Sequence, residues 1–270
     1  MRKAVLAFLL VALAHAEFRL VAMDVLLDVD EQGNALVTEK LHYIITTQYH
    51  IALYESSLAK TDLASWGTVV GSDEVRYHLD SRVVSIGNVV VRPSPTSRCN
   101  PIADLCHGEL TITYGAGPSK GRGGEPIAGT GVFTVEEYKP RTIRYTLNKG
   151  ALQFQTSELG DVILGENERL SFMLPRGAKV TYVNPLPGGT EQAGDGRQQL
   201  SWSNYVLAHF SMVFEKEEGL DQEVIGFFMG ARGRLYSFIS GPEGAPAVAL
   251  IVIITGSYLY LQRKQKKAQV

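Results

Sequence analysis

Alternating apolar and polar residues predict a β-hairpin near the start of the chain. Every second residue from Val21 to Val29 is apolar, and a similar alternation runs from Leu36 to Ile45. The turn between them, Asp30–Asn34, contains a Gly-Asn step. A period of two on both sides of such a turn is typical of two antiparallel strands. Glu39 interrupts the apolar row of the second strand, and we expect its carboxylate to face water at an edge or rim of the sheet.

Further short strand patterns continue along the chain as far as residue 214. They are Val83–Ile86, Val89–Val91, Gly108–Tyr114, Val132–Val135, Thr142–Leu147, Leu170–Pro175, Lys179–Val183, Gln199–Trp202 and His209–Phe214. Pro93 and Pro95 are expected to end the second of these, and Tyr49–Trp66 is compatible with a short helix. Many short strands with frequent turns predict a mainly β fold with one or two β-sandwich-like domains, a first β-rich region at 17–116 and a second at 132–218.

The first 16 residues have the layout of a secretory signal peptide. Arg2 and Lys3 form a short basic region, and an apolar run from Ala4 to Ala14 follows. Ala14-His15-Ala16 is a small-x-small pattern, which predicts cleavage after Ala16. The apolar run is about half the roughly 20 residues that a spanning helix needs, so an uncleaved anchor or a buried N-terminal helix is the less favoured alternative.

The other end of the chain predicts a transmembrane helix at 245–261. This segment carries no charge, and its 17 residues are at the short end of the spanning range. A basic tail at 262–270 follows, containing Arg263, Lys264, Lys266 and Lys267. Because basic flanks stay in the cytoplasm, the tail predicts a type I protein in the cell membrane, with its β-rich ectodomain outside. A glycolipid-anchor signal is disfavoured because such signals end in apolar residues.

The segment before the predicted span, 219–240, predicts an amphipathic helix. Its apolar residues from Leu220 to Ile239 follow one helical stripe, and most of its charged residues lie elsewhere. Such a helix either lies in the membrane interface or packs on the β-rich part of the chain. The sequence leaves both alternatives open.

The position of the charged residues changes the meaning of the net charge. The chain has 26 Lys and Arg and 28 Asp and Glu, and its net charge is −2. Six of the basic residues lie at the two ends, so residues 17–244 hold 20 basic and 28 acidic residues, a net charge of −8. An acidic ectodomain disfavours nucleic acid and anionic headgroups as partners. Solubility alone explains a charge of this size, and a basic partner is the alternative.

The two cysteines of the chain, Cys99 and Cys106, lie in the segment CNPIADLC. In an exported domain, two cysteines around a proline-containing loop most simply form a disulfide. Closing an eight-residue loop contributes about 2.5 kcal/mol in the chain-entropy model. The neighbouring His107 suggests a Cys-Cys-His metal site, but the spacing matches no zinc pattern. We therefore predict the disulfide.

The segment 117–131 is predicted to be a glycine-rich loop. It contains G-x-S-x-G from Gly117 to Gly121, but the glycines and prolines that follow exclude the helix of a nucleophile elbow. It is not a phosphate-binding loop, because no Gly-Lys-Ser/Thr ends it. Lys120 and Arg122 make it a candidate contact loop on an acidic body, whereas loop statistics favour a plain flexible connector.

The sequence contains no motif that predicts catalysis or metal binding. The histidines beyond the predicted signal peptide have neither H-x-x-x-H nor H-E-x-x-H spacing; they are His42, His50, His78, His107 and His209. The carboxylate pairs Glu136-Glu137 and Glu217-Glu218 lie in polar turns and are expected to be solvated. We therefore expect no catalytic residue, no metal and no cofactor.

Three segments together resemble uncharacterised single-span, membrane-anchored surface proteins of archaea. They are DVLLDVDEQGNALVTEKLHY, RPSPTSRCNPIADLCHGELTITY and LSFMLPRGAKVTYVNPLPGG, the last followed by LSW. In the third, Leu-Pro-x-Gly-Ala is similar to the start of a hairpin in surface β-domains. The resemblance covers most of the predicted ectodomain. It implies a β protein exposed at the cell envelope on one helix, and it implies no activity.

Two functions are compatible with these patterns. The preferred hypothesis is a structural or protein-interaction component of the cell envelope, whose acidic ectodomain binds other envelope proteins. The alternative is an envelope receptor for a ligand or sugar, or a hydrolase, with a cleft between two β domains. That alternative requires folding to bring together residues such as Trp66, Tyr182 and Trp202.

Overall fold

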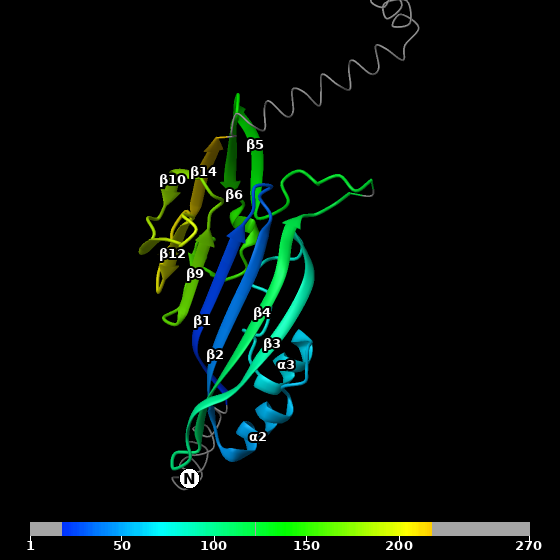
Figure 1. Ribbon diagram of the computed structural model, residues 1–270, viewed down its shortest axis with the longest axis vertical. Helices are drawn as coiled ribbons and strands as arrows, with labels where there is room; N and C mark the ends of the chain where they lie inside the picture. The colour runs from blue at the N-terminus through cyan, green and yellow to red at the C-terminus, as the bar shows by residue number, and fades with distance from the viewer. Residues whose placement is uncertain (1–17, 122, 218–270) are drawn as a thin grey trace, which may run out of the picture. The chain divides into compact units, whose positions relative to one another are not determined.

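The computed structural model describes residues 18–121 and 123–217, and these residues form one compact, mainly β unit (Figure 1). The predicted signal peptide (1–16), amphipathic helix (219–240), transmembrane helix (245–261) and basic tail (262–270, with Arg263, Lys264, Lys266 and Lys267) lie outside the described residues. Within the described ranges, no helix has the length and apolar character needed to cross a membrane.

The largest element of the fold is a seven-stranded sheet with the strand order β11-β12-β9-β1-β2-β4-β3. Its strands are β1 (Phe18–Val29), β2 (Ala35–Thr46), β3 (Val84–Asn100), β4 (Leu105–Pro118), β9 (Glu168–Met173), β11 (Gly189–Gln192) and β12 (Gln198–Ser203). Only β1 and β9 pair in parallel. Both predicted β-rich regions contribute strands to this sheet, so they are not separate domains.

The predicted hairpin is confirmed as β1 and β2. The carboxylate of Asp30 accepts hydrogen bonds from the backbone N–H groups of Gln32 and Asn34, at 2.9 and 2.8 Å. Gly33 adopts φ +79°, a conformation that favours glycine. The alternating apolar side chains of both strands are buried on one face of the sheet, which explains why the period of two was informative.

Strand β3 differs from the sequence expectation, because it continues through Pro93 and Pro95 to Asn100. It is an edge strand whose only partner is β4. A proline cannot donate a backbone hydrogen bond, but an edge strand leaves half of its donors unpaired in any case. The two predicted strands Val83–Ile86 and Val89–Val91 are therefore parts of one long strand, with an irregular register between Gly87 and Val90.

Two smaller sheets complete the β structure. The four-stranded sheet has the order β10-β14-β6-β5, and the three-stranded sheet has the order β13-β8-β7. Their strands are β5 (Phe133–Lys139), β6 (Thr142–Leu147), β7 (Gln155–Thr156), β8 (Val162–Ile163), β10 (Lys179–Asn184), β13 (Val206–Leu207) and β14 (Ser211–Glu217), and a short 3-10 helix, η1, spans Lys149–Ala151.

An aromatic cluster joins the four-stranded sheet to the buried face of the seven-stranded sheet. The ring of Phe133 on β5 lies edge-on to Phe172 on β9 and to Phe214 on β14, with centroids 6.0 and 5.3 Å apart. Tyr145 on β6 stacks on Phe214 at 4.5 Å. The two sheets therefore pack face to face in this region, as layers of a β-sandwich do.

Two helices cover the other end of the same buried face, α2 (Gln48–Ser56) and α3 (Leu63–Val70). They lie where the sequence was compatible with a short helix. Asp62 caps α3 by accepting the N–H of Ser65 at 2.8 Å, and Gly71 ends it in the left-handed region. The hydroxyl of Tyr54 on α2 donates toward the carbonyl of Glu109 at 2.8 Å, which fixes the helix to β4.

The contact between α2 and β4 requires a glycine at position 108. A Cβ atom at Gly108 would lie 2.9 Å from side-chain atoms of both Ile45 and Tyr54. We predict that Gly108→Ala lowers the free energy of unfolding by about 1–3 kcal/mol through overpacking. A Cβ atom at Gly87 meets nothing within 4 Å, so Gly87→Ala is the matched control and should change stability by no more than about 0.5 kcal/mol. Chemical denaturation that finds equal midpoints for both variants would contradict this packing.

Candidate functional site

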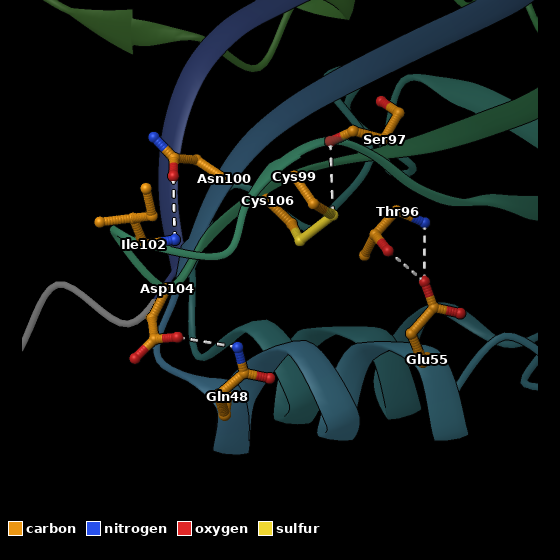
Figure 2. Close-up of a disulfide and its surroundings, with 9 residues drawn as sticks. All are labelled: Gln48, Glu55, Thr96, Ser97, Cys99, Asn100, Ile102, Asp104 and Cys106. Atoms are coloured by element: carbon orange, nitrogen blue, oxygen red, sulfur yellow. Dashed lines mark hydrogen bonds between the residues drawn. A yellow bond between two sulfur atoms is a disulfide. The ribbon is translucent and has the colours of Figure 1, made fainter.

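The predicted disulfide between Cys99 and Cys106 is present, with an S–S distance of 2.06 Å and a Cα–Cα distance of 4.1 Å (Figure 2). It joins the end of β3 to the start of β4, where Asn100 pairs with Leu105. Both sulfur atoms are used in this bond, so the alternative Cys-Cys-His site with His107 does not form. The disulfide closes the tip of the β3–β4 hairpin.

Hydrogen bonds hold the backbone of this hairpin tip. The side-chain oxygen of Asn100 accepts the N–H groups of Ile102 and Ala103, at 3.0 and 3.3 Å. The amide of Gln48 on α2 donates to the carboxylate of Asp104 at 2.8 Å, as Figure 2 shows. The side chain of Ile102 is 97% exposed. The tip therefore presents a fully exposed apolar side chain on a fixed backbone.

The predicted glycine-rich loop begins later than residue 117, because β4 continues through Gly117 to Pro118. After Pro118 the chain makes a short bridge between Lys120 and Pro126, and the described residues from there to β5 contain no helix, so the G-x-S-x-G segment is not a nucleophile elbow. Lys120 is exposed and lies at the rim of a groove. Arg122, the other predicted contact residue, lies outside the described residues.

This groove lies on the outer face of the seven-stranded sheet, opposite the buried core, and has a volume of about 770 Å³. Its floor is bare backbone, because the neighbouring strands β3 and β4 place Gly87 opposite Gly115. Leu36, 53% exposed, pairs with Gly115 from the other side and adds an apolar side chain to the floor. Two glycines side by side allow another polypeptide to approach the sheet closely.

Charged and amide groups surround this glycine floor. On one side, the guanidinium of Arg197 contacts the carboxylate of Asp28 at 2.5 Å. The turn residues Asp30 and Asn34 line the same groove, and so does Lys120. The rim therefore offers donors and acceptors of both charge signs, and Lys120 is the sequence-predicted contact residue that the structure places there.

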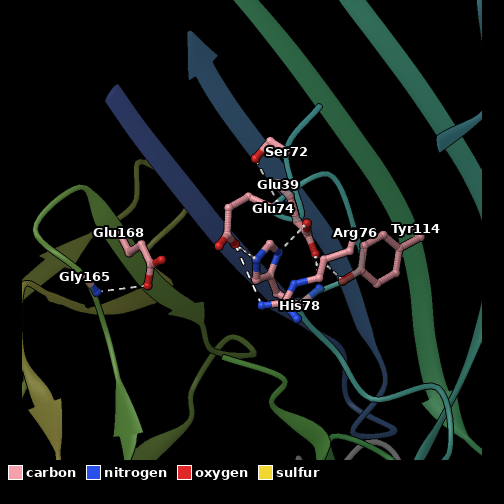
Figure 3. A network of polar contacts seen from close by, with 8 residues as sticks. All are labelled: Glu39, Ser72, Glu74, Arg76, His78, Tyr114, Gly165 and Glu168. Atoms are coloured by element: carbon pink, nitrogen blue, oxygen red, sulfur yellow. Dashed lines mark hydrogen bonds and ion pairs between the residues drawn. The ribbon is translucent and has the colours of Figure 1, made fainter. Parts of the chain in front are cut away.

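A buried polar network is the second feature that could carry chemistry. Glu39 was expected to face water, and this expectation is wrong, since the side chain is fully buried on β2, which lies between β1 and β4 inside the sheet. Its carboxylate accepts the backbone N–H of His78 at 2.9 Å, the ring Nδ1 of His78 at 2.9 Å and the hydroxyl of Tyr114. Glu74 lies 3.3 Å from the other ring nitrogen, Nε2, of His78 (Figure 3).

The ionisation of these groups follows from their partners. Burial opposes the charged imidazolium of His78, but the hydrogen bonds and charges of Glu39 and Glu74 outweigh it, and the pKa of His78 rises to about 9. The hydrogen bond from His78 lowers the pKa of Glu74. Burial, followed by the charge of Glu39, raises the pKa of the Tyr114 hydroxyl. His78 is therefore an imidazolium between two carboxylates at neutral pH.

This arrangement stabilises the fold and is closed to substrate. Glu39 and His78 are at most 1% exposed, and Tyr114 is fully buried. The backbone of the His78 segment also pairs with residues around 152, since Leu79 forms a bridge with Leu152. The network thus fastens the loop between α3 and β3 to the middle of the sheet.

Sequence reasoning missed this network because its members are far apart in the chain. Glu39 and His78 are separated by 39 residues, and no motif spacing connects them. One signal was present, since Glu39 is a carboxylate at an apolar position of a regular strand. A carboxylate at a buried position requires a partner, but the sequence does not show that His78 and Tyr114 supply it.

The residues of the predicted cleft differ in their surroundings. Trp66 is buried against Tyr54 at 5.2 Å, and Trp202 is buried against Phe210 at 5.2 Å. Tyr182, by contrast, is 53% exposed on β10. The two tryptophans are core residues, so they do not line the predicted cleft.

The two buried tyrosines near this network provide a matched pair of variants. Tyr114→Phe removes a hydrogen bond to the buried carboxylate of Glu39, and we expect it to cost about 1–3 kcal/mol of unfolding free energy. Tyr43 is equally buried, but its hydroxyl has no hydrogen-bond partner among the described residues, so Tyr43→Phe should leave stability unchanged or raise it. Urea denaturation of both variants tests this contrast, and a larger loss for Tyr43→Phe would refute it.

The raised pKa of His78 predicts that stability falls at alkaline pH. Between pH 6.5 and about 9 the folded state keeps a proton on His78 that the unfolded state has released. The stabilisation that the protonated His78 gives the folded state is therefore complete below pH 6.5 and is lost as the pH rises through about 9. The expected loss is roughly 3 kcal/mol. His78→Gln should flatten the pH dependence of the unfolding free energy, whereas His209→Gln, which changes an exposed side chain, should not. A wild-type protein that is equally stable at pH 6 and pH 9 would contradict the assignment.

The comparisons with known proteins do not connect this chain to a family. A scan of protein-family models finds none that matches, and a search of the curated proteins finds no significant similarity. The resemblance to membrane-anchored archaeal surface proteins therefore stays a prediction, and the geometry described above is the basis for assigning a function.

Proposed function

We propose that this chain is an exported, single-span membrane protein whose β-rich unit binds other proteins of the cell envelope. The membrane topology rests on the sequence patterns of the two ends of the chain. The binding role rests on the groove over Gly87 and Gly115, which is the single observation that carries it. The two parts of the proposal are independent and are tested separately.

The form of the groove favours a polypeptide over a small molecule. Small-molecule sites enclose most of the surface of their ligand, whereas this groove lies open on the face of a sheet. Its glycine floor admits a close approach by another chain, and its rim of Asp30, Asn34, Lys120 and the Asp28–Arg197 pair can hydrogen-bond to a polypeptide. An open, polar-rimmed surface with an apolar floor is typical of a protein-interaction site.

A variant that fills the groove should abolish partner binding without harming the fold. A Cβ atom at Gly115 would meet the carbonyl oxygen of Gly87 at 3.7 Å, an ordinary contact distance, so the backbone at this position accepts a side chain. We expect Gly115→Val to remove partners that crosslink to the protein in native membranes. The matched control is Thr111→Val, on the same strand and face but outside the groove. Recovery of a strictly solitary wild-type protein, or equal partner yields for both variants, would contradict the binding role.

The topology has its own test. A tag placed after Val270 should be protected from external protease in intact cells, because the basic tail is predicted to stay in the cytoplasm. A tag after the predicted cleavage position should be accessible in the same cells. Digestion of the tag after Val270 would refute the type I arrangement and would leave the groove proposal unaffected.

A further inference from the structure

The hairpin tip described above and the groove lie at opposite ends of the same two strands, β3 and β4. The tip follows Cys99 and precedes Cys106, and the groove is formed where β4 reaches Gly115. Strand β4 rises roughly 34 Å between Cys106 and Ala116. Because the sheet holds the two features apart, the tip cannot reach the groove of its own chain, and any contact between them joins two copies.

The tip has the properties of a preorganised contact residue. Ile102 is 97% exposed, although apolar side chains of this size are usually buried. The backbone that carries it is fixed by the disulfide, by the N–H groups that donate to the Asn100 side chain and by the hydrogen bond from Gln48 to Asp104. A side chain held in one conformation loses little entropy when it docks, which favours binding.

We propose that the hairpin tip of one copy docks in the groove of a second copy, with Ile102 against the floor formed by Leu36, Gly87 and Gly115. The inference rests on the proposed function and names the partner of that groove. Leu36 supplies the apolar contact, and the two glycines leave the room that an isoleucine side chain requires.

The charges beside the tip complement those of the groove. Arg98 and Asp104 flank the tip, and both are exposed. Asp30 and Lys120 line the groove. A docked tip can therefore place a guanidinium near Asp30 and a carboxylate near Lys120, which favours one orientation of the two chains.

The placement of the two features also determines the symmetry of the pair. When two copies lie antiparallel, each tip faces the groove of the other copy, so the pair has twofold symmetry and contains the contact twice. A twofold pair closes on itself and does not extend into a filament.

Site-specific photocrosslinking on the full-length chain tests this pairing. p-Benzoylphenylalanine replaces Ile102, and the protein is purified in detergent and reconstituted in vesicles as a mixture of isotopically light and heavy copies. We expect a product with the mass of two chains that contains one light and one heavy copy. Mass spectrometry should place the crosslink in residues 85–88 or 115–118. Gly115→Val should reduce the yield by at least about tenfold, and Thr111→Val should not.

Three results would overturn the proposal. They are the absence of a product with the mass of two chains, a crosslink outside the groove, and an undiminished yield in Gly115→Val. The control places the same probe at Leu159, which is also highly exposed but lies on the turn between β7 and β8. The probe at this position should give no product with the mass of two chains. If Gly115→Val removes a different protein from native membranes while position 102 forms no pair, the proposed binding function stands and the self-pairing fails.

Discussion

The buried carboxylate of Glu39 is the interaction on which the rest of the fold depends. A charged group in the middle of a seven-stranded sheet is costly unless each of its oxygens has partners. Tyr114 from β4 and His78 from the loop before β3 supply them. These hydrogen bonds join β2, β4 and the loop between α3 and β3, and they hold that loop in place where it crosses the core. Because His78 also contacts Glu74, the loop brings its own second carboxylate to the site.

This constraint makes the sheet a rigid support for the features at its ends. The aromatic cluster of Phe133, Phe172 and Phe214 covers one end of the buried face, and helix α2 covers the other through Tyr54. The groove lies on the outer face, whereas the network of Glu39, His78 and Tyr114 lies among the buried residues. The glycine floor and the disulfide-closed tip are both continuations of β3 and β4, so their separation is set by strand length.

The sequence predicted the features whose cause is local. The β1–β2 hairpin followed from regular alternation around Gly33, and the disulfide followed from two cysteines in a short loop. The predictions were wrong where a feature depends on contacts between segments that are distant in the chain. Pro93 and Pro95 were expected to end a strand, because only the completed sheet shows that β3 is an edge. Glu39 was expected to face water, because its partners His78 and Tyr114 are distant in the chain. The groove was also beyond prediction, since Gly87 and Gly115 become neighbours only through strand pairing.

The protonation state of His78 tests the account most directly. Nitrogen-detected NMR of the imidazole ring reports whether Nδ1 and Nε2 both carry protons. The network described here predicts that both are protonated at pH 8, with a titration midpoint near pH 9. It also predicts that Glu39→Gln lowers that midpoint, because the charge beside Nδ1 is lost. A ring that is neutral at pH 8, with a midpoint near the ordinary value of 6.5, would contradict the claim that an imidazolium between two carboxylates holds this fold together.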